Sequence, residues 1–75
     1  MYYFRIFLRA NIDNPIMDKY NIKAKNASAA VDIAKETMFR RLSLQGKHIL
    51  ENDIEILLVT DMYGEKIDII PYGKE

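Results

Sequence analysis

Aromatic and basic side chains alternate near the start of the chain, in a spacing that suits a binding surface. They occupy every second position: Tyr3, Arg5, Phe7 and Arg9. A period of two places all four on one face of an extended strand. Aromatic rings bury large areas at protein interfaces or stack on bases, and arginines bind carboxylates or phosphates. The pattern therefore predicts a binding strand for a protein or for single-stranded nucleic acid, with Lys23 as a further phosphate contact.

Residues with catalytic potential are few. His48 is the single histidine, it lies beside Lys47 in a segment with no clear periodicity, and the chain has no cysteine. No serine lies in a recognisable nucleophile turn. The three glycines are explained by a helix end, a turn and the tail, so no phosphate-binding loop is predicted. We expect a protein that is not an enzyme and has no cofactor, no metal and no small-molecule substrate.

The net charge of zero hides an asymmetry along the chain. Residues 1–47 hold nine basic and four acidic side chains, giving +5, whereas residues 48–75 hold two basic and seven acidic ones, giving −5. The acidic residues do not have the spacing of a calcium loop. Two interpretations remain open. The two halves pair their charges across strands of one sheet, or a basic surface binds an anionic partner and an acidic surface a cationic one.

One segment, residues 26–45, has the periodicity of an amphipathic helix. Its apolar stripe consists of Ala30, Val31, Ala34, Thr37, Met38 and Leu42. Asn26 is expected to cap the first turn, and Gly46 to end the helix in a left-handed conformation. Phe39 falls about 120° from the stripe, so it is a candidate contact on the helix side.

Four other segments alternate between apolar and polar residues and are predicted strands: residues 2–11, 19–25, 54–61 and 66–72. Residues 13–15 form a turn, and the lysine-rich second strand suits a sheet edge. The last two strands form a hairpin in which Asp61 lies opposite Lys66. These elements predict a single α+β domain over residues 1–75, with 72–75 as a loose tail. It is a two-layer sandwich with one helix on a four-stranded, mainly antiparallel sheet, in the order β-β-α-β-β.

One helix covers only one face of such a sheet. The other face is predicted to carry six large apolar side chains: Tyr3, Phe7, Leu57, Val59, Ile70 and Tyr72. Exposed apolar patches of several hundred Å² mark interaction sites. A second copy of the chain, a different protein or single-stranded nucleic acid are the candidate partners. The neutral composition and the absence of nucleic-acid motifs favour a protein, with the homodimer left open.

The segment from Ile22 to Ala34 resembles a strand-to-helix join that recurs in small α+β domains, including short proteins carried by phages and plasmids. In size and composition the whole chain resembles the compact proteins with which mobile elements bind and block host enzymes. That resemblance implies an inhibitor or adaptor of a host protein. No apolar run reaches the roughly 20 residues of a membrane span and no signal peptide is recognisable, so we expect a cytoplasmic protein.

Overall fold

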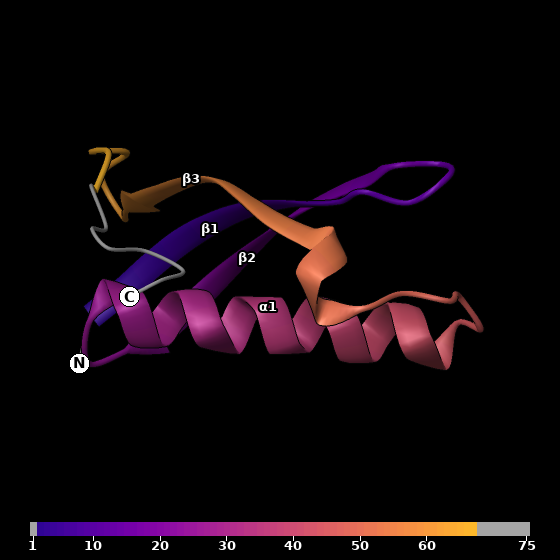
Figure 1. Cartoon of the computed structure of the whole chain (residues 1–75). Helices are drawn as coiled ribbons and strands as arrows, with labels where there is room; N and C mark the ends of the chain where they lie inside the picture. Colours follow the sequence, from indigo (N-terminus) through magenta and orange to yellow (C-terminus); the bar gives the residue numbers. More distant parts are fainter. Residues whose placement is uncertain (1, 68–75) are drawn as a thin grey trace.

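The computed structural model describes residues 2–67, which form an α+β fold with one helix packed against an antiparallel sheet (Figure 1). The elements in chain order are strands β1 (Tyr2–Ala10) and β2 (Ile16–Ala24), helix α1 (Ala27–Leu44), a 3₁₀ turn η1 (Glu51–Asp53) and strand β3 (Ile54–Asp61). Within these residues no helix is both long and apolar enough to cross a membrane.

Strand β1 is the centre of the sheet, which has the order β2-β1-β3. It buries every second side chain on the helix side, from Phe4 to Ala10, as its alternation predicts. Tyr2 is paired with Ala24 and Ala10 with Ile16, in an unbroken antiparallel register. Strand β2 therefore forms one edge of the sheet, in agreement with its lysine content.

The helix begins and ends at the predicted residues. The Asn26 side chain accepts a hydrogen bond from the Ala29 N–H (2.8 Å). At the other end Gly46 has φ +84° and donates its N–H to the Ser43 carbonyl (3.0 Å), while the Lys47 N–H bonds to the Leu42 carbonyl (3.1 Å). This is a Schellman motif, in which a left-handed residue satisfies the last carbonyls of the helix.

The apolar stripe of the helix is confirmed with one exception. Its buried residues are Ala30, Val31, Ala34, Met38 and Leu42, which pack against buried side chains of all three strands. Thr37 is predicted to belong to the stripe, but it is exposed and its hydroxyl donates to the Ile33 carbonyl (2.7 Å). That local hydrogen bond satisfies the threonine hydroxyl, which would find no partner among the apolar side chains of the core.

The prediction of four strands in the order β-β-α-β-β is wrong for the described residues, whose sheet has three. Of the expected fourth strand, 66–72, the structure describes only Lys66 and Ile67. Lys66 forms an isolated bridge with Thr60, and the Ile67 N–H donates to the Val59 carbonyl (2.8 Å). Ile70, Tyr72 and the predicted tail 72–75 lie outside the described residues.

The prediction that Asp61 lies opposite Lys66 is also wrong, because Lys66 lies opposite Thr60 instead. The Asp61 carboxylate accepts hydrogen bonds from the Tyr63 N–H (2.8 Å) and the Glu65 N–H (2.9 Å). An aspartate at the start of a turn satisfies the following backbone donors in this way. The local bonds therefore fix a register one residue away from the predicted one.

A β-bulge in β3 changes which of its side chains face the helix. Phe7 is paired with Leu58, but the next residue, Leu8, is paired with Ile56, so Leu57 is the extra residue. Beyond the bulge the alternation is inverted. The prediction that Val59 lies on the uncovered face is therefore wrong, since it is buried (5% exposed) opposite the buried Ile6.

Candidate partner-binding face

The sheet face turned away from α1 is the candidate binding site, and we call it the open face. The register places the following side chains on it: Tyr3, Arg5, Phe7 and Arg9 from β1; Met17, Lys19, Asn21 and Lys23 from β2; Glu55, Leu57, Leu58 and Thr60 from β3. In Figure 1 the helix runs along the other side of the sheet. Six of the predicted site residues, Tyr3, Arg5, Phe7, Arg9, Lys23 and Leu57, are thereby brought onto one surface.

The centre of the open face is apolar and hollowed. Phe7 is half-buried between Lys19 on β2 and Leu58 on β3. Beside it Met17 is 67% exposed and Leu57 is 37% exposed. A hollow of about 350 Å³ lies there, lined by Phe7, Leu8, Met17, Asp18, Lys19 and Leu57. Apolar side chains exposed around a hollow can receive a side chain of a partner.

Two of these apolar residues, Met17 and Leu58, are not among the site residues predicted from the sequence. Met17 is absent because the predicted second strand begins at residue 19, whereas β2 begins at Ile16. The alternation that places Lys19 outward can be extended backward by two residues without reaching the turn proline, and it then places Met17 outward. No pattern in the sequence predicts that Leu58 faces outward, because its orientation results from the bulge at Leu57.

Basic side chains lie along the β2 side of the open face. The ammonium of Lys23 is 5.5 Å from the centre of the Tyr3 ring, a cation–π contact. Arg5 donates from Nε to Oδ1 of Asn21 (3.2 Å). Neither contact neutralises the cation, so both residues keep their charge available to an anionic group.

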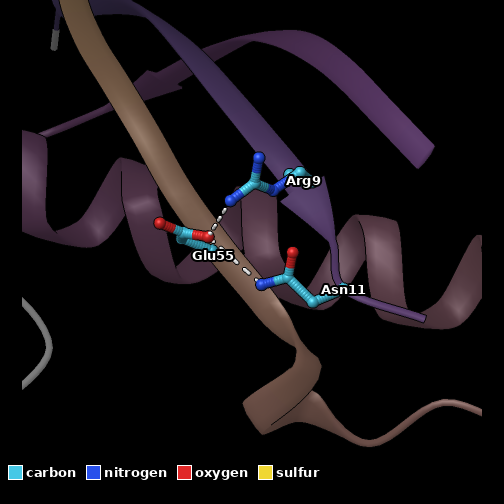
Figure 2. Close-up of polar contacts among 3 residues, drawn as sticks. All are labelled: Arg9, Asn11 and Glu55. Atoms are coloured by element: carbon cyan, nitrogen blue, oxygen red, sulfur yellow. Dashed lines mark hydrogen bonds and ion pairs between the residues drawn. The ribbon is translucent and has the colours of Figure 1, made fainter. Parts of the chain in front are cut away.

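The open face also carries one carboxylate, Glu55, which lies opposite Arg9 and away from Lys23. Figure 2 shows Glu55 Oε1 accepting hydrogen bonds from Arg9 (2.8 Å) and from the amide of Asn11 (3.1 Å). The Asn11 hydrogen bond, followed by the hydrogen bond and charge of Arg9, lowers the pKa of Glu55 below its ordinary value. Within the part of the chain that the structure describes, Arg9 is therefore the one arginine of the open face that is paired with an acidic side chain.

Asp18 belongs to the helix side of β2, where it forms an ion pair with Arg41 of α1. Burial acts to raise the pKa of Asp18, but the hydrogen bond from the Lys19 N–H and the ion pair with Arg41 together lower it. The Arg41 guanidinium also lies 5.6 Å from the centre of the Tyr20 ring. These contacts fasten the edge strand to the helix, and the charge of Asp18, which also lines the hollow beside Phe7, is paired with that of Arg41.

Phe39 is separated from the other candidates because it lies on the helix. Its side chain is partly buried against the core, and it contributes to a hollow of about 260 Å³ together with Glu36, Arg40, Ser43, Leu44 and Glu51. In the loop that follows the helix, Leu50 is 70% exposed, whereas Ile49 is buried. Phe39 thus marks a second, smaller surface and not part of the open face.

His48 lies in a third hollow, of about 450 Å³, formed by residues 12–16 and Lys47. Its side chain is exposed, and no carboxylate or serine is hydrogen-bonded to it within the described part of the chain. Residues 2–67 also contain no group of three histidine, cysteine or acidic side chains that could hold a metal ion. This end of the molecule offers no assembled catalytic or metal-binding group among those residues.

No protein-family model, curated protein or solved structure matches the chain. A function must therefore be inferred from its own surface. Among residues 2–67, the open face combines exposed apolar side chains with cations that have no ion-pair partner, at a hollow around Phe7 that is bordered by Lys19 and lies beside Arg5.

Proposed function

We propose that the protein is a non-catalytic binding domain that covers part of another protein with its open face. The observation that carries this proposal is the exposure of Met17 (67%), Tyr3 (51%) and Leu57 (37%) on the sheet face that α1 leaves uncovered. Interfaces are centred on well-packed apolar anchors surrounded by polar residues, which is the arrangement around Phe7. We further propose that it acts in the cytoplasm as an inhibitor or adaptor, in line with its resemblance to small proteins of mobile elements.

The test is capture of a partner from lysate of the source cells by the tagged chain and two variants. Leu57→Asp places a charge in the hollow, and Ile33→Asp makes the same kind of change at a helix residue that is 42% exposed. We expect Leu57→Asp to reduce recovery of one dominant partner on the order of tenfold, and Ile33→Asp to leave it unchanged. Equal recovery by the wild type and Leu57→Asp would place the binding site elsewhere.

Single-stranded nucleic acid is the alternative partner, and one observation supports it. Because of the bulge, Asp61 lies opposite the buried Phe4 on the helix side, which removes a carboxylate from the face that carries Tyr3 and Phe7. An oligonucleotide bound there would dissociate steeply with added salt, because its counterions are released on binding. Binding that depends on Tyr3, Arg5, Phe7 and Arg9 would support this alternative.

A further inference from the structure

The described strands leave the open face strongly basic although the chain is neutral. Four of its side chains are cationic, Arg5, Arg9, Lys19 and Lys23, and one is anionic, Glu55, giving a net charge of +3. Glu55 is already paired with Arg9. No carboxylate of residues 2–67 forms an ion pair with Arg5, Lys19 or Lys23. Among the described residues, the face therefore presents three cations without an ion-pair partner, and one of them, Lys19, borders the hollow.

The acidic residues near this sheet are engaged elsewhere in the fold. Asp18 is paired with Arg41 on the helix side. Asp53 accepts the Leu50 N–H (2.9 Å) in the 3₁₀ turn, and Asp61 holds the turn after β3. Among residues 2–67, cross-strand pairing of the two charged halves on the open face is thus limited to Arg9 and Glu55. A second copy of the chain would bring like charges together if the two open faces met, which is costly at an interface.

We propose that the segment bound by the open face is an acidic, extended stretch of another protein that inserts one apolar side chain into the hollow beside Phe7. This rests on the proposed binding function and adds the chemistry of the partner. Lys19 borders the hollow, and Lys23 lies four residues further along β2. Arg5 stands opposite Asn21, between them.

The spacing of these cations along the sheet predicts the spacing of the acidic residues in the bound segment. Same-face residues of a strand recur about every 7 Å, so the rows of Lys19, Asn21 with Arg5, and Lys23 follow one another at that interval. An extended peptide repeats its side chains with the same period. Its apolar anchor would occupy the hollow, and acidic residues two and four positions further along the peptide would reach Arg5 and Lys23.

The test uses a fluorescein-labelled peptide, Gly-Leu-Ser-Glu-Ser-Glu-Ser-Gly, titrated with the full chain and followed by fluorescence anisotropy. We expect saturable binding that weakens with added salt and that is lost when the two glutamates are replaced by lysine. Arg5→Glu and Lys23→Glu should each weaken binding about tenfold, equivalent to about 1.4 kcal/mol. Lys47→Glu, an equal charge change at an exposed residue outside the open face, should have little effect. Circular dichroism of each variant checks that the fold is retained.

The outcomes separate the acidic partner from the broader binding function. If capture from lysate depends on Leu57 but the peptide does not bind, or binds equally well with lysines, the acidic partner is wrong and the binding function stands. If Lys47→Glu weakened peptide binding as much as the open-face variants do, the binding would reflect only the overall charge of the chain. The open face would then not be the site of peptide binding. Tighter binding of a fluorescein-labelled oligothymidylate than of the peptide, through the same Arg5 and Lys23, would assign the face to nucleic acid instead.

Discussion

At the scale of single residues, the contacts of Arg9 and Asn11 with Glu55 favour the ionised form of this open-face carboxylate. The Asn11 amide is the larger cause of the lowered pKa of Glu55, and Arg9 adds to it. The pKa of Glu55 in the folded state lies below its pKa in the unfolded chain. The contact therefore stabilises the fold fully at pH values above the unfolded-state pKa. The stabilisation is lost as the pH falls through the folded-state pKa.

We predict that Asn11→Ala raises the pKa of Glu55 toward its ordinary value, because it removes one donor to the ionised carboxylate. The measurement is the titration of the Glu55 side-chain carboxyl resonance by NMR. Asn14→Ala, a change at an exposed asparagine of the neighbouring turn, serves as the control and should leave the titration unchanged. An unaltered Glu55 midpoint in Asn11→Ala would show that the amide contact is absent in solution.

At the scale of elements, the bulge in β3 decides which side chains form the core and which form the site. Leu57 and Val59 are two residues apart, and simple alternation places both on the same face. The structure separates them, since Leu57 borders the hollow while Val59 packs against the helix side of the sheet. Substituting aspartate at each of these two positions distinguishes a strand with the bulge from a strand with simple alternation.

We predict that Val59→Asp prevents folding at neutral pH, because a buried carboxylate without a partner costs several kcal/mol in a domain stabilised by only about 4–11 kcal/mol. Leu57→Asp should retain a cooperative thermal transition, since its side chain is partly exposed. Circular dichroism melting of the two variants is the measurement. Two equally destabilised variants would show that both side chains are buried, and two equally stable ones that the strand has no bulge.

At the scale of the whole molecule, the distribution of charge sets how copies of the chain meet. Like-charged open faces repel one another most strongly when little salt is present, since the screening length increases to about 30 Å at 0.01 M ionic strength. We predict that light scattering at low salt gives a molar mass near the 8.8 kDa of one chain. A stable dimer at low salt that Leu57→Asp dissociates would mean that the open face binds a second copy, and the site for another partner would then lie near Phe39.

Much of this fold can be predicted from the sequence because the signals are local. The cap at Asn26, the left-handed Gly46 and the alternation along β1 each depend on a few neighbouring residues, and each is confirmed. The same alternation is enough to assign the four outward side chains of β1 to one face. Such features follow from hydrogen bonds and periodicities that are complete within one element.

The rest depends on contacts between elements. The strand order, the extra residue at Leu57 and the resulting burial of Val59 arise where β3 pairs with β1. The charge of the open face depends on the same pairing, because it sends Asp61 to the helix side and leaves Glu55 beside Arg9. By itself the sequence determined the helix with both its ends, the alternation along β1, and the presence of β2 and β3. Only the tertiary structure decided which residues the two faces of the sheet carry, since a single bulge inverts every side chain that follows it.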